Sequence, residues 1–159
     1  MFGYRNTSSS AFNPDDGEKI IGWPNVSPAG SQSITYNTSA STFTLTSGDT
    51  YLINANVCYD APANNQHYAQ LSCKSTVNNQ NTTILGLTPK SGGASGGLGT
   101  QTQVSLNMVF TPNATNNVIG FYFYPIPGSA KLTLLSGTTV SIVKIGVGSR
   151  EITTRRLLK

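Results

Sequence analysis

Few residues of this chain have side chains that could do chemistry. The 159 residues include one histidine, His67, together with two cysteines and six acidic residues. A metal centre held by several histidines therefore cannot form within this chain. His67 lies in a stretch rich in Asn and Gln, and no nucleophile motif surrounds a candidate serine, so nothing favours a Ser-His-Asp arrangement. We expect His67 to have no catalytic role.

Two other groups of residues have types that bind ions. Asp15, Asp16 and Glu18 lie close together near the N-terminus, but they lack the spacing of a calcium-binding loop. The glycine-rich segment 90–99 is followed neither by a Lys-Ser/Thr pair nor by a helix pattern, both of which a phosphate-binding loop requires. The sequence thus predicts no catalytic residue, no metal site and no cofactor, and we expect that the protein is not an enzyme.

The two cysteines are expected to be free thiols. Cys58 belongs to the alternating run 51–59, and it lies on the face opposite to the apolar members of that run. Cys73 is in phase with Leu71, which we expect in the core. Thiols that point in different directions do not meet the geometry of a disulfide.

The composition and the apolar spacing indicate a folded, all-β chain. Only 10% of the residues are charged and 37% are hydrophobic, with Ser, Thr, Asn and Gly abundant. Disordered chains usually combine low hydrophobicity with high net charge, and that charge is missing here. No helical period extends over eleven residues without a Gly, Pro or Asn. The expected strands are 19–26, 34–36, 42–46, 51–59, 68–76, 82–87, 103–110, 118–124, 132–135 and 138–146.

The clearest local signal is at residues 42–59. Segments 42–46 and 51–59 both alternate, and Ser47-Gly48-Asp49 lies between them, which predicts a β-hairpin. Eight to ten short strands separated by turn residues indicate one sandwich of two antiparallel sheets. We expect an N-terminal arm at 1–18, one domain at 19–146 and a basic tail at 147–159.

This part of the chain resembles a known superfamily. The stretch with Phe43, Gly48, Tyr51 and Ile53 is similar to a hairpin of the tumour-necrosis-factor-like superfamily, which includes the globular heads of complement-type proteins. The segment 140–146, after a Ser-Gly-Thr-Thr turn, resembles the last strand of that family. The resemblance covers about residues 20–146. It implies a ten-strand jelly roll and a trimer around a threefold axis.

One strand favours assembly independently of the resemblance. Segment 118–124 is apolar or aromatic on both faces, whereas a half-solvated strand alternates with polar residues. The interface candidates are Phe121, Tyr122, Phe123 and Tyr124, and we expect the tyrosine pair to face a partner because tyrosine is enriched at interfaces. The alternative is that loops of the same chain cover this strand.

The basic residues are concentrated in the expected tail. The net charge is +4, and the tail carries Arg150, Arg155, Arg156 and Lys159, which leaves the rest of the chain close to neutral. This position argues against specific nucleic-acid binding. The tail is expected to dock on a neighbouring subunit, or else to be solvated. No segment is apolar enough to span a bilayer, and the first residues lack the pattern of a secretory signal.

Two functional hypotheses remain. The first is a structural protein of a virus particle, a capsid, vertex or fibre-head component that is made in the host cytoplasm and located in the virion. It acts by oligomerisation and contacts neighbouring virion proteins, with segment 90–99 facing outward. The second is a trimeric attachment module that recognises a glycan or protein on a cell surface.

Overall fold

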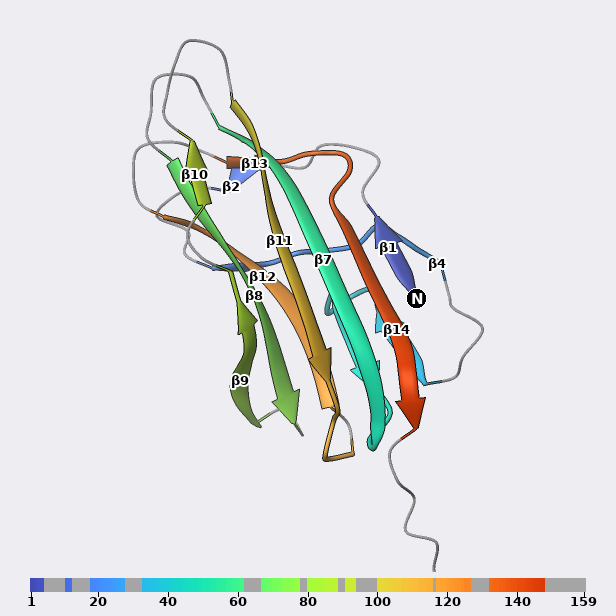
Figure 1. The fold of residues 1–159 in the computed structure, drawn as a ribbon. Coiled ribbons are helices and arrows are strands. Elements are labelled where there is room, and N and C mark those ends of the chain that lie inside the picture. Colours follow the sequence, from blue (N-terminus) through green and yellow to red (C-terminus); the bar gives the residue numbers. More distant parts are fainter. Residues whose placement is uncertain are drawn as a thin grey trace, which may run out of the picture.

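The structure, a computed structural model, is a sandwich of two antiparallel sheets (Figure 1). It describes residues 1–4, 11–12, 18–27, 33–61, 67–77, 80–88, 91–93, 100–115, 117–126 and 132–147. Every regular element among these residues is a strand, so the all-β prediction is confirmed. The described residues form fourteen strands rather than the eight to ten expected, because short strands extend the edges of both sheets.

The first sheet contains three long strands that lie side by side, β11, β7 and β14 (Figure 1). Strand β11 (Thr100–Phe110) pairs with β7 (Asp49–Ala61) along its whole length. Apart from β11, neighbouring strands of this sheet follow in the order β2 (Ala11–Phe12), β13 (Leu132–Leu134), β7, β14 (Thr139–Val147), β1 (Phe2–Tyr4) and β4 (Asn25–Ser27).

The second sheet is built around β12 (Asn117–Ile126), which pairs with β8 (His67–Val77) over ten residue pairs. The expected strands 68–76 and 82–87 correspond to β8 and β9, which pair with each other. The other strands of this sheet are β10 (Ser91–Gly93), β9 (Gln80–Leu87), β6 (Thr42–Leu45), β5 (Ile34–Asn37) and β3 (Lys19–Ile20).

The core lies between the two sheets and follows the alternation in the sequence. The inward residues of β7 are fully or almost fully buried, while its outward residues, including Cys58, are only half-buried. Cys73 is buried on β8, and both cysteines are free, as expected. The largest buried side chains are Trp23, Tyr51, Tyr59, Phe43, Phe121 and Phe123.

The prediction of a β-hairpin at residues 42–59 is wrong. Strand β6 pairs with β5 and β12 in the second sheet, whereas β7 pairs with β11, β13 and β14 in the first. The turn between them therefore crosses from one sheet to the other, and Phe43 and Tyr51 enter the core from opposite sides. Gly48 has a φ of 80° and its N–H donates to Pro112 O at 2.8 Å, which fixes the corner.

The N-terminal segment is part of the sandwich. Residues 2–4 of the expected arm form β1, which lies between β14 and β4. The expected strand 19–26 is two strands, because residues 21–24 cross from β3 in the second sheet to β4 in the first. Within segment 90–99, which was expected to be a loop, residues Ser91–Gly93 form strand β10, and this strand pairs with β8. The tail from residue 148 lies outside the described residues.

Candidate functional site

Two of the four predicted interface residues are core residues. Phe121 and Phe123 are fully buried, so neither is available to a partner. The ring of Phe121 packs edge-on against Trp23 at 5.9 Å and against Phe43 at 6.1 Å. Phe123 packs against Tyr59 at 5.4 Å. The aromatic character of this face of β12 is thus explained by core contacts, of which the Phe123–Tyr59 contact joins the two sheets.

The chain itself covers part of the tyrosine pair on the outer face of β12. Strand β3 pairs with β12 and places Ile20 opposite Tyr122, and a Cβ added to Gly120 would lie 3.0 Å from Ile20 Cδ1. Lys74 Nζ lies 4.9 Å from the centre of the Tyr122 ring, and Glu18 holds that ammonium in an ion pair. Tyr122 is half-buried for this reason. Tyr124 is also half-buried and remains an interface candidate.

The structure describes only some of the residues considered for catalysis. His67 is the first residue of β8, and its side chain lies outside the described part of the structure. Asp15 and Asp16 also lie outside it, whereas Glu18 accepts a hydrogen bond from Ser72 Oγ at 2.9 Å. The described residues contain no group of three or more side chains suited to a metal ion. They also include no helix long and apolar enough to cross a membrane.

One ion pair lies where the two sheets meet at the β6–β7 corner. Lys144 Nζ is 2.7 Å from Asp49 Oδ2, and Asp49 is buried with 6% of its surface exposed. The hydrogen bond from Lys144 holds the pKa of Asp49 below its ordinary value, although burial acts in the opposite direction. The pair satisfies a carboxylate that would otherwise be isolated at the edge of the core.

The Tyr51 hydroxyl completes this corner. It donates to Ser33 O at 3.0 Å and accepts the N–H of Thr46 at 3.1 Å. Burial raises the pKa of Tyr51, so the hydroxyl stays protonated and keeps its donor at neutral pH. The corner therefore holds β5, β6, β7 and β14 together through hydrogen bonds and one ion pair.

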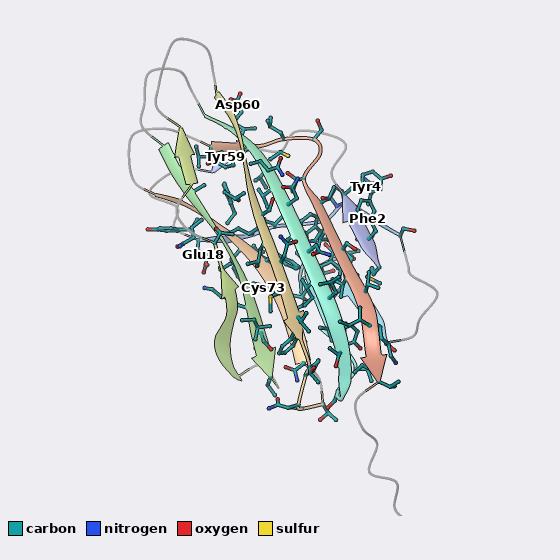
Figure 2. All side chains as sticks on the ribbon, viewed as in Figure 1. Phe2, Tyr4, Glu18, Tyr59, Asp60 and Cys73 are labelled. Carbon is teal, nitrogen blue, oxygen red and sulfur yellow. The ribbon has the colours of Figure 1, made fainter. Side chains whose placement is uncertain are left out.

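The sequence-based reasoning missed an exposed apolar surface on the first sheet. All six exposed large apolar side chains of the described residues belong to β1, β11 and β14. Figure 2 shows Phe2 and Tyr4 on β1, at the edge of the molecule, and their rings stack at 5.9 Å. The six are Phe2, Tyr4, Val109, Val143, Ile145 and Val147, with exposed fractions from 38% to 70%.

The strand register arranges the outward residues of this sheet in rows, which we call the β7 outer face. The apolar row is Val109, Leu52 and Val143 on β11, β7 and β14. The next two rows extend to β1 and end in Phe2 and Tyr4. They consist of Asn107, Asn54, Ser141 and Phe2, then Ser105, Asn56, Thr139 and Tyr4.

Two sequence signals indicate single members of this face, although neither shows that the rows lie together. Strand β14 places Ile142 and Val143 in succession, so one of the two must face outward. Phe2 and Tyr4 flank Gly3, which is the alternation of a strand with two aromatic residues on one face. The predicted tail residues Arg150, Arg155, Arg156 and Lys159 lie outside the described residues.

Comparisons with known proteins identify the fold. No family model and no curated protein matches the sequence. Among solved structures, the structure of Eiger TNF from S. frugiperda covers 94% of this chain and 97% of that chain, with a TM-score of 0.60 and 8% sequence identity. A similarity at this identity shows the fold alone. The chain therefore has the tumour-necrosis-factor-like jelly-roll fold that its sequence resembles.

Proposed function

We propose that the protein is a non-enzymatic, homotrimeric module that works through contacts between its subunits and through recognition at its surface. The observation that carries this proposal is the gathering of all exposed large apolar side chains of the described residues on strands of one sheet. Exposed apolar patches of this kind mark protein–protein contacts. The trimeric state follows the expectation that comes with the fold.

The chemistry of the β7 outer face suits contact with a second copy of the same chain. Its three rows contain only apolar, amide and hydroxyl side chains, and no charged residue. In a symmetric oligomer each residue meets equivalents of its neighbours, so an uncharged face avoids like-charge repulsion. Burying an exposed valine, isoleucine or phenylalanine side chain contributes roughly 1.5–3 kcal/mol. Several such side chains per subunit favour assembly.

The solution mass tests this proposal. Light scattering on a sizing column is expected to give about three times the chain mass of 16.8 kDa. Val143→Asp places a charge in the apolar row and is expected to give the mass of a single chain, with an unchanged β-sheet circular dichroism spectrum. A wild-type monomer would contradict the proposal.

Tyr124→Asp is the matched variant on the competing surface. Tyr124 is half-buried on the outer face of the second sheet, away from the β7 outer face. We expect this variant to keep the wild-type mass. Dissociation by Tyr124→Asp but not by Val143→Asp would instead assign the contact to the tyrosine pair of β12.

A narrower proposal places this module in a virus particle, as a capsid, vertex or fibre-head component located in the virion. It rests on the neutral composition rich in Ser, Thr and Asn, and on the basic residues of segment 147–159. In this role, Arg150, Arg155, Arg156 and Lys159 would dock on an adjacent virion protein. Replacing all four by Ser should abolish incorporation into particles without changing the solution mass. Normal incorporation of that variant would count against the docking role.

A further inference from the structure

A second feature of the surface is a cleft of about 310 Å³ at the edge of the second sheet. One wall is the segment that crosses between the sheets, with Gly22, Trp23 and Pro24. The other wall is strand β5 and the turn that follows it. The turn side contributes Tyr36, Thr38 and Ser41, so the described lining carries no charge.

The aromatic residues of the cleft are held rigidly. Trp23 packs edge-on against Phe121, and the Tyr36 ring lies 4.7 Å from Phe43. The backbone N–H of Trp23 donates to the Tyr36 hydroxyl at 3.0 Å, which connects the two walls. The Tyr36 hydroxyl keeps its own hydrogen as a donor. The cleft therefore offers a ligand the half-buried ring of Tyr36 in a preformed position, and a preformed pocket with few polar groups is typical of small-molecule sites.

The turn between β5 and β6 carries a strained residue at the cleft. Asn37 Oδ1 accepts the Ala40 N–H at 3.0 Å, which closes the turn. Ser41 ends it with a φ of 56°, a conformation that favours glycine or asparagine. Its Oγ would lie 3.2 Å from a Cβ on Gly22, so the absence of a side chain at position 22 leaves room for the hydroxyl. A serine in this position keeps a hydroxyl in the cleft at a cost in backbone strain.

Trp23, which contributes to the lining of the cleft, carries a buried polar group without a partner among the described residues. Trp23 is 98% buried, since 2% of its surface is exposed, and its indole Nε1–H has no acceptor among the described residues. A buried donor without an acceptor is destabilising, and such groups are uncommon in folded proteins. Trp23 is thus a residue of the core, and its nearness to the cleft makes its emission a reporter of binding there.

We propose that this cleft binds one unit of a neutral saccharide. A sugar ring combines an apolar C–H face, which suits the half-buried Tyr36 ring, with hydroxyls that pair with Thr38 and Ser41. An entirely apolar ligand would leave those hydroxyls unpaired, and an ionic ligand would find no opposite charge in the described lining. The inference extends the surface-recognition part of the proposed function. The cleft lies within one chain, so it does not depend on the trimer.

Intrinsic fluorescence tests the proposal at a single site, because Trp23 is the only tryptophan of the chain. The probes are the methyl glycosides of glucose, galactose, mannose, fucose and N-acetylglucosamine, titrated into the full chain in the millimolar range. At least one of them is expected to shift the Trp23 emission in a saturable manner. Sorbitol controls for solvent effects, and a proline-rich peptide tests a competing occupant.

Two substitutions separate binding from folding. Ser41→Gly relieves the positive φ and removes the hydroxyl, so thermal stability should rise or stay equal while binding weakens about fivefold, the effect of one neutral hydrogen bond. Thr38→Val changes an exposed turn residue and should weaken binding to a similar extent. Tyr124→Phe, which removes a tyrosine hydroxyl elsewhere on the second sheet, should leave binding unchanged.

Three results would overturn the proposal. The first is that no neutral glycoside shifts the Trp23 emission in a saturable manner. The second is that Ser41→Gly and Thr38→Val both bind as tightly as the wild type. The third is that only the proline-rich peptide binds in a saturable manner. The Val143→Asp variant distinguishes the two proposals. It is expected to bind saccharide as the wild type does even when it is monomeric, and a trimer without saccharide binding would leave the assembly proposal intact.

Discussion

At the scale of single residues, the Asp49–Lys144 pair makes stability depend on pH. The pKa of Asp49 is below its ordinary value of 3.8 in the folded state, so near that pH the unfolded chain binds more protons. The pair therefore stabilises the fold fully above about pH 4, and this contribution is lost as the pH falls through the folded-state pKa. Asp49→Asn should lower the urea midpoint at neutral pH and flatten the loss of stability below about pH 4.

Lys144→Met is the complementary variant for this pair. It leaves the buried Asp49 carboxylate without its cation, so we expect a larger loss of stability at neutral pH than for Asp49→Asn. Urea unfolding of the two single variants and of the double variant measures the coupling. Additive effects would show that the two side chains do not stabilise each other.

The two thiols should differ in reactivity. Cys73 is fully buried, and burial raises its pKa to about 12, so it carries almost no thiolate at neutral pH. Cys58 is half-buried on the outer side of β7. A chromogenic disulfide reagent should titrate one thiol in the native protein and two in denaturant. The native Cys58→Ser variant should show no reaction, and rapid labelling of Cys73 in that variant would mean that the core opens easily.

Alternation along a strand was enough to predict these two cysteine environments, because it depends only on the two-residue period of the backbone. It could not predict which tyrosines are free. Ile20 lies opposite Tyr122 in the paired strands and Lys74 lies over its ring, and these contacts join residues 102 and 48 positions apart in the sequence. Such pairing is decided by the topology of the sheets.

At the scale of elements, β1 depends on a glycine. A Cβ at Gly3 would lie 2.9 Å from Val140 Cγ1 and 3.3 Å from Trp23 Cβ, closer than normal contacts. Gly3→Ala should therefore push β1 away from β14 and destabilise the fold by about 1–3 kcal/mol, as overpacking usually does. Urea unfolding measures this change.

Gly146→Ala is the control in the same sheet. The nearest atom to a Cβ there is Thr50 Cβ at 3.5 Å, an ordinary contact, so this variant should change stability little. Equal effects of Gly3→Ala and Gly146→Ala would show that the close packing of β1 on Val140 contributes nothing specific.

Most strand positions could be predicted from the sequence, but one strand pairing was not. Segments 42–45 and 49–61 have the pattern of a hairpin, and yet they lie in different sheets. A glycine turn between two alternating segments fits a hairpin and a corner between sheets equally well, since both place one side of each strand in the core. The choice depends on the strands that arrive later in the chain, β11, β12 and β14.

At the scale of the whole molecule, the sandwich has two outer surfaces of different character. The second sheet carries the Glu18–Lys74 ion pair and the threonines of β6 on its outside, which suits contact with water. The first sheet carries exposed apolar side chains and no charge over three rows. The residues of these rows come from β1, β7, β11 and β14, so the face exists only in the folded chain and could not be read as a motif.

This asymmetry leads to a prediction about the assembled protein. If the β7 outer face is buried between copies, unfolding also dissociates the trimer, and mass action raises the melting temperature with protein concentration. We expect an increase of roughly 2–4 °C for each tenfold rise in concentration, measured by circular dichroism at several path lengths. Val143→Asp should melt at a lower temperature that does not depend on concentration. A wild-type melting temperature that is constant across the same range would mean that this apolar face stays exposed in solution and that its partner is a different protein.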